Sequence, residues 1–107
     1  MHSVAVPALA VMLLALTTTP GSAEGDAGAG EKLAREHCTK CHDIEPEGAF
    51  KEFPPSFASI ATFRSRKQIY ARIAFPTLHT NMPPLGYVLF GENLDHLTAY
   101  IVSLEKR

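Results

Sequence analysis

The sequence lacks the features that mark several large classes of protein. It has no tryptophan, and no apolar run reaches the about 17 to 25 residues that a membrane-spanning helix needs. It shows no internal repeat, phosphate-binding loop, paired-carboxylate site or serine–histidine–aspartate triad. The formal net charge of −1, with no obviously basic face, excludes strong general attraction to nucleic acid or to acidic lipid. What remains is one small domain whose chemistry must lie in a few residues.

The chain has only two cysteines, and both lie in one motif, Cys38-Thr39-Lys40-Cys41-His42. C-x-x-C-H is the attachment signature of a c-type haem. Each thiol can bond to one vinyl group of the same porphyrin, and His42 is then carried to the iron as its proximal ligand. A thioredoxin-like pair does not require the histidine, and zinc would need two more ligands at matching spacing. The motif therefore predicts one haem c, bound covalently through Cys38 and Cys41.

The N-terminal segment resembles an export signal. Residues Val4 to Leu16 are almost wholly apolar, and Gly21 and Ala23 supply the small residues that precede a cleavage site. The segment departs from the usual pattern because His2 stands where lysine or arginine is typical. We expect a signal peptide over 1–23, a domain over 24–107 and export to the periplasm. A permanent membrane anchor is the weaker alternative because the apolar run is short.

Hydrophobic spacing predicts helices and no strand, so the expected fold class is all-α. Ser65 and Gln68 form a capping-box pattern, which predicts that a helix begins there. In chain order, the expected elements are a helix from about Asp26 or Gly28 to about Thr39, a loop over 43–55, a short helical turn over 57–63, a helix from Ser65 to Pro76, an irregular stretch over 77–86 and a helix over 91–104.

The first expected helix is amphipathic. Its inward face is expected to carry Ala29, Leu33 and the two cysteines, which share one side at helical spacing. Its solvent face is expected to carry the charged residues Glu31, Lys32, Arg35 and Glu36.

A second axial ligand decides whether a haem iron transfers electrons or binds other molecules. Met82 is the only methionine outside 1–23, and it lies in a loop that the following prolines stiffen. We therefore favour its thioether as the ligand over a role as an apolar gap-filler. His79 is the rival, because two imidazoles can also ligate a haem. His37 and His96 are expected to be solvated helix residues.

Four segments in order resemble the class I cytochrome c family in its small bacterial, single-haem form. They are Gly30-x-x-Leu33-Ala34 before the motif, Pro55-Ser56-Phe57 after it, Met82-Pro83, and the closing Leu97-Thr98-Ala99-Tyr100-Ile101. The resemblance implies three to four helices packed around the haem, with His42 proximal and Met82 distal to the iron.

The resemblance also implies roles for supporting residues. The Pro55 carbonyl would accept a hydrogen bond from His42 Nδ1–H, and Gly30 would let the last helix cross the first against Leu97 and Tyr100. An apolar wall around the porphyrin would consist of Phe57, Ile60, Ile69, Ile73 and Leu85. The chain departs from the family where Gly91 must cap the last helix. Cationic residues that could meet the haem propionates, or form a solvated face or a docking patch, are Arg64, Arg66, Lys67 and Arg72.

The function expected from the motif and the resemblance is periplasmic electron transfer, in which the iron cycles between Fe(III) and Fe(II). The protein would be a monomer that meets redox partners transiently, and it would not be an enzyme. One alternative is a haem subunit bound stably to a periplasmic or membrane dehydrogenase or oxidase. Another is a five-coordinate haem protein that binds a small ligand.

Overall fold

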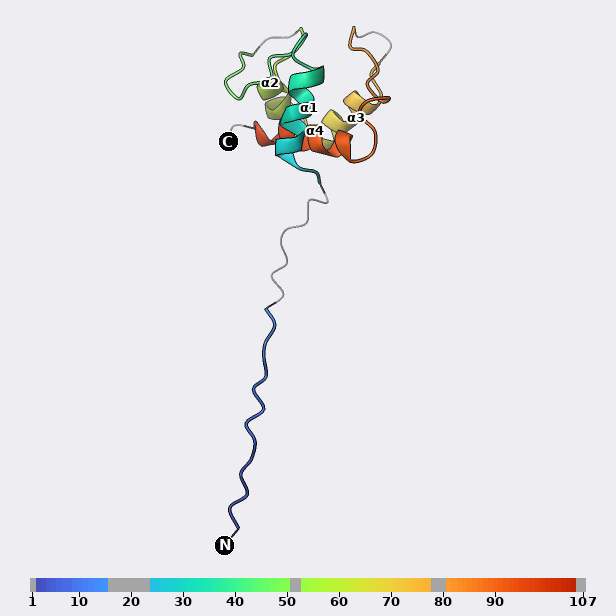
Figure 1. Cartoon of the computed structure of the whole chain (residues 1–107). Helices are drawn as coiled ribbons and strands as arrows, with labels where there is room; N and C mark the ends of the chain where they lie inside the picture. Colours follow the sequence, from blue (N-terminus) through green and yellow to red (C-terminus); the bar gives the residue numbers. More distant parts are fainter. Residues whose placement is uncertain (1, 16–23, 51–52, 78–80, 106–107) are drawn as a thin grey trace.

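The computed structural model describes residues 2–15, 24–50, 53–77 and 81–105. These residues form four α-helices and no strand, which confirms the expected all-α class. The helices are α1 (Ala27–His37), α2 (Phe57–Phe63), α3 (Arg66–Ala74) and α4 (Glu92–Ser103). Residues 2–15 carry no regular secondary structure and extend away from the helical body (Figure 1). None of the described helices is long and apolar enough to cross a membrane. The cleavage site expected after Ala23 lies outside the described residues.

Short-range capping contacts set where the first three helices begin, and the sequence predicted those of α1 and α3. Asp26 Oδ1 accepts hydrogen bonds from the amides of Gly28 (2.8 Å) and Ala29 (3.3 Å), which caps α1. Ser56 Oγ accepts from the Ser59 amide at 3.1 Å and caps α2. The capping box of α3 is confirmed, because the Gln68 amide donates to Ser65 Oγ (3.2 Å) and the Ser65 amide to Gln68 Oε1 (2.9 Å).

No side chain among the described residues caps the N-terminus of α4. Gly91 occupies its N-cap position at φ +58°, a conformation that favours glycine over residues with a Cβ atom. The apolar side chains that recur at helical spacing along α4 and at its C-cap are all buried: Leu94, Leu97, Ile101 and Leu104.

The first and last helices cross in close contact at Gly30. A Cβ atom on Gly30 would lie 1.9 Å from the His96 carbonyl oxygen and 2.8 Å from Tyr100 Cβ, so only glycine fits. This confirms the expected crossing. The expected inward face of α1 needs correction, because the contact with α4 buries Gly30 and Ala34 while Ala29 and Leu33 are only half-buried.

The crossing also changes the role expected for His96, which is half-buried. Its Nδ1 accepts a hydrogen bond of 2.8 Å from the Asp26 amide, so the imidazole holds the residue that caps α1. A second contact holds the same segment: Arg66 of α3 donates to the Glu24 carbonyl oxygen. The chain that enters α1 is thus held by both α3 and α4. The prediction that His96 is a solvated residue was wrong because this contact joins residues 70 positions apart.

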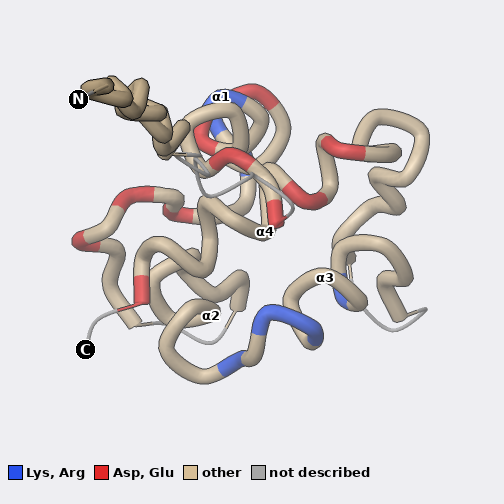
Figure 2. Tube along the Cα trace, turned by 90° about the horizontal axis from the view of Figure 1, so that it is seen from below, with Lys and Arg blue, Asp and Glu red and all other residues tan. Residues whose placement is uncertain are grey.

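One hydrophobic core lies between α1, α4 and the two shorter helices. It includes side chains from every helix and from the intervening loops: Ala34, Cys38, Ile44, Phe57, Ala61, Ile69, Ile73, Leu85, Leu89, Leu94, Leu97, Tyr100, Ile101 and Leu104. The basic residues of α3 and of the turn before it lie apart from most acidic residues, which occupy α1, the loop over 43–47 and the region of α4 (Figure 2). The expected solvated face of α3 therefore has a single sign of charge.

Candidate functional site

The two cysteines lie in a tight turn that begins where α1 ends. The amides of Cys41 and His42 both donate to the Cys38 carbonyl oxygen, at 3.2 Å and 2.9 Å. Both thiols are free; Cys38 is buried and Cys41 is exposed. Burial, with a smaller contribution from the Cys41 charge, raises the pKa of the Cys38 thiol to about 11. The turn therefore presents two unpaired sulfur atoms in different surroundings, immediately before His42.

The imidazole of His42 is oriented by the backbone of a distant segment. Its Nδ1 lies 2.6 Å from the Pro55 carbonyl oxygen, so Nδ1 carries the hydrogen and donates it. This contact, expected from the family resemblance, is confirmed. In the neutral imidazole with this hydrogen bond, Nε2 is the nitrogen that carries no hydrogen and can ligate a metal. The role of His42 toward iron stays a prediction.

Phe57 packs against this imidazole from the N-terminus of α2. The two ring centroids are 5.3 Å apart with the planes tilted by 48°, and Phe57 is only 3% exposed. Tyr100 also contacts Phe57, with 6.4 Å between the ring centroids. Other side chains expected to wall the porphyrin lie in or against the same core: Ile60, Ile69, Ile73 and Leu85. Phe57 therefore supplies apolar cover beside His42, and the contact of these five side chains with a haem stays a prediction.

Met82 is half-buried and packs against the hydrophobic core from an irregular stretch of chain. The same stretch continues into a turn at Leu85, whose carbonyl oxygen accepts from the amides of Val88 (2.9 Å) and Leu89 (2.7 Å). The rival His79 lies outside the described residues, so the choice between the two side chains stays a prediction.

The donor set fits a haem better than a bare metal ion. Within the described ranges, no group of three or more histidine, cysteine, aspartate or glutamate side chains could hold a metal ion. A haem requires less of the protein, because the porphyrin supplies four of the nitrogen ligands. His42 oriented by Pro55, two unpaired thiols and the adjacent buried ring of Phe57 fit that requirement.

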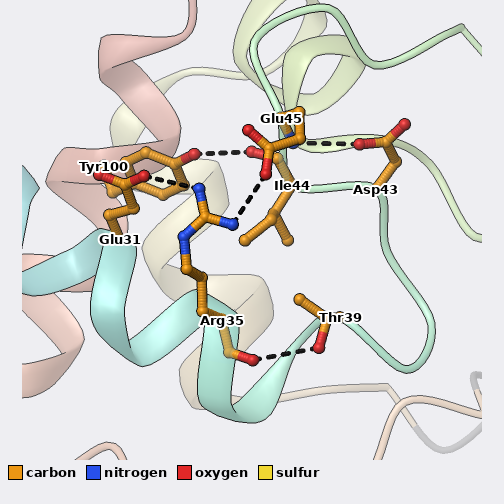
Figure 3. Close-up of polar contacts among 7 residues, drawn as sticks. All are labelled: Glu31, Arg35, Thr39, Asp43, Ile44, Glu45 and Tyr100. Atoms are coloured by element: carbon orange, nitrogen blue, oxygen red, sulfur yellow. Dashed lines mark hydrogen bonds and ion pairs between the residues drawn. The ribbon is translucent and has the colours of Figure 1, made fainter.

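Three successive residues after His42 are each held by a different helix, and Figure 3 shows the contacts of the second and third of them. The Asp43 carbonyl oxygen accepts from the Phe57 amide of α2 at 2.9 Å. The Ile44 carbonyl oxygen accepts from the Tyr100 hydroxyl of α4 at 2.7 Å, and Glu45 Oε1 accepts from Arg35 of α1 at 2.8 Å. We call residues 43–45 the His42 loop.

Sequence reasoning missed the His42 loop contacts, because it placed Arg35 on the solvent face without a partner. The pair with Glu31 at i, i+4 (2.8 Å) could have been inferred from helical spacing. The pair with Glu45 could not, since Glu45 lies in a loop beyond the turn that follows α1.

A shallow groove runs along the outer side of α1, away from the motif. Its lining is mainly charged or small and includes Asp26, Glu31, Lys32, Glu36 and Asn93. Neither cysteine nor His42 lines it, so the groove is separate from the candidate haem site.

Comparisons with known proteins give one short similarity. No family profile matches the chain, and no solved structure matches it. The chain is similar to the cytochrome c2 of Pararhodospirillum photometricum, with 52% identity over 33 residues. That match spans 31% of this chain and 29% of the relative. The similarity suggests a haem protein that carries electrons, and it covers too little of either chain to show the family.

Proposed function

We propose that this protein is a secreted c-type cytochrome that carries single electrons between partner proteins in the periplasm. One haem would be bound covalently through Cys38 and Cys41, with His42 and Met82 as the axial ligands. The observation that carries the proposal is the 2.6 Å contact between His42 Nδ1 and the Pro55 carbonyl oxygen, next to two free thiols. The similarity to a cytochrome c2 over part of the chain supports the same function.

In this function, the polypeptide holds the haem ligand His42 and fixes its orientation. The hydrogen bond from Nδ1 to Pro55 fixes the ring and raises the basicity of Nε2, as partners of ligating histidines generally do. Phe57, which is buried, packs against the imidazole and limits its movement. Both contacts hold the ring in one orientation, so a change of charge at a ligated metal would need little rearrangement.

Met82 would supply the second axial ligand. A thioether is a weak ligand, so the protein must position it, and packing of Met82 against the core would help to do so. The haem supplies a one-electron change between Fe(III) and Fe(II), and a methionine ligand raises its potential relative to a second histidine.

Electron transfer of this kind requires no chemical substrate besides the two partner proteins. A reduced donor protein loses one electron to this protein, and an oxidised acceptor protein later takes one electron from it. No bond forms or breaks and no proton needs to move, so none of the side chains must act as an acid or base. Association with each partner would be weak and involve a small interface.

The test is to express the full chain in a bacterium that attaches haem c and to record spectra of the oxidised and reduced protein. Haem should remain with the polypeptide under denaturing conditions, and replacing both cysteines by alanine should abolish this. The Met82→Ala variant should lose the weak long-wavelength band that reports an iron–sulfur bond. His79→Ala, the matched control, should keep that band. Attached haem without the band, or tight carbon monoxide binding by the reduced protein, would contradict the Met82 assignment.

A second candidate function is a haem subunit of a stable periplasmic complex. Phe50 and Phe63 contact each other with ring centroids 5.8 Å apart, yet remain 61% and 71% exposed. Phe53 is 88% exposed. Exposed aromatic residues of this kind are enriched where a partner packs. Co-purification with an oxidoreductase that persists at high salt would favour this candidate over the free carrier.

A further inference from the structure

The His42 loop connects both ends of the hydrogen bond that orients His42. At the donor end, Asp43 follows His42 directly in the chain. At the acceptor end, Pro55 lies two residues before Phe57, whose amide donates to the Asp43 carbonyl oxygen at 2.9 Å. A displacement of Asp43 therefore moves the imidazole and the Pro55 carbonyl relative to each other.

Two contacts hold the loop beyond Asp43. The Tyr100 hydroxyl donates to the Ile44 carbonyl oxygen from the buried side. Arg35 donates from the outer side, through Nη1 to Glu45 Oε1 and through Nη2 to Glu31 Oε1, each at 2.8 Å (Figure 3). Within the loop, the Glu45 amide donates to Asp43 Oδ1 at 3.0 Å, which links the residue that Arg35 holds to the residue next to His42.

Arg35 is suited to this contact over the whole pH range. Hydrogen bonds to Glu45 and then to Glu31 raise its pKa further above an already high ordinary value, so the guanidinium stays charged. Its planar fork lets it hold one carboxylate on its own helix and one on the loop at the same time. The two carboxylates are similarly exposed, at 43% for Glu31 and 50% for Glu45.

We propose that Arg35 is a positioning residue for His42: by holding Glu45, it fixes the loop that sets the contact between His42 Nδ1 and Pro55, and thereby tunes the reduction potential. This inference rests on the proposed function, since it requires His42 to ligate a haem iron. A loosened loop lengthens the hydrogen bond and makes Nε2 less basic. A less basic ligand stabilises Fe(III) less, so the potential rises.

The decisive comparison is between Glu45→Gln and Glu31→Gln in the haem-loaded full chain. Both variants remove one carboxylate from the same arginine, but only Glu45→Gln weakens a contact with the loop, because it replaces a charge-assisted hydrogen bond by a neutral one. We expect Glu45→Gln to shift the Fe(III)/Fe(II) equilibrium toward Fe(II) about threefold more than Glu31→Gln does, which is about 28 mV for a one-electron couple. Equal shifts in the two variants would overturn the proposal.

Arg35→Lys separates position from charge, because lysine keeps the charge and lacks the fork that reaches both carboxylates. We expect it to raise the potential in the same direction as Glu45→Gln. An effect of charge alone predicts almost no change in this variant, and that result would also overturn the proposal.

An independent readout is solvent exchange of the His42 Nδ1 proton, measured by NMR in the reduced protein. Exchange should be faster in Glu45→Gln and Arg35→Lys and unchanged in Glu31→Gln, whereas a general loss of stability would speed it in all three. Unchanged exchange in every variant would overturn the inference. The proposed function fails by a different result: no attached haem, or iron coordination that persists unchanged in His42→Ala.

Discussion

The hydroxyl of Tyr100 donates a hydrogen bond of 2.7 Å to the carbonyl oxygen of Ile44, 56 residues earlier in the chain. The contact is buried, with 6% of Tyr100 and 3% of Ile44 exposed. It joins the last helix to the loop beside the candidate haem ligand His42. The packing of α4 and the orientation of that ligand are therefore linked through one hydroxyl group.

Tyr100→Phe should destabilise the protein, because it leaves a buried carbonyl without its hydrogen bond. We expect a loss of about 1 to 2 kcal/mol in the free energy of unfolding, the cost of an unsatisfied buried acceptor. Denaturant titration measures this. The control is Tyr70→Phe, since Tyr70 is 38% exposed and its hydroxyl can bond to water. Equal losses in the two variants would show that the buried contact contributes nothing specific.

The same tyrosine should make the protein sensitive to alkali. Burial first, and then the charge of Glu31, raises the pKa of Tyr100 above its ordinary value. The folded state therefore keeps the proton at a pH where the unfolded state has lost it. This contribution to stability is complete below about pH 10 and is lost as the pH rises through the higher folded-state pKa. Unfolding titrations across this window should show a steeper loss in the parent than in Tyr100→Phe.

Gly30→Ala should prevent the close crossing of α1 and α4. The added methyl group would lie 1.9 Å from the His96 carbonyl oxygen. Residues 30 and 96 both belong to helices, so neither backbone can shift without moving its whole helix. We expect a loss of more than about 3 kcal/mol, or failure of the folded protein to accumulate.

Gly28→Ala is the matched control in the same helix. There the nearest atom to an added Cβ is the Asp26 side chain at 3.3 Å, which can shift. Alanine also favours the helix by about 0.5 to 1 kcal/mol, so the net change should be small. A similar loss at both positions would contradict the crossing.

Before haem attachment, the two thiols should react at different rates. Cys41 is exposed, whereas burial raises the pKa of Cys38 to about 11 and keeps it in the less reactive protonated form. Limited alkylation at mildly alkaline pH, followed by mass spectrometry of the peptides, should find Cys41 modified first. Equal modification of the two residues would show that Cys38 is not buried in the haem-free chain.

Features encoded by neighbouring residues could be predicted from the sequence. The capping box at Ser65 and Gln68 lies within one helical turn, and the apolar spacing of α4 follows one helix. The family resemblance added the contact between His42 and Pro55, which no local pattern specifies.

The parts of the fold and of the candidate site that could not be predicted depend on contacts between segments far apart in the sequence. His96 and Arg35 both occupy helix positions that could equally face solvent, and only the crossing of helices and the path of the loop give them partners. The positions of His96 and Arg35 in the sequence do not identify Asp26 and Glu45 as their partners, because each contact joins residues on different elements.

The close approach of α1 and α4 at Gly30 also has a consequence for the order of events during folding. Contacts between segments far apart in the sequence form late and slowly, and α2 and α3 lie between α1 and α4 along the chain. Until α4 docks, the surface of α1 that carries Gly30 and Ala34 has no cover, and the Ile44 carbonyl oxygen lacks its hydrogen bond from Tyr100. The core that buries Cys38 is incomplete during that interval, so docking of α4 ends the open period of this thiol, whereas Cys41 stays exposed.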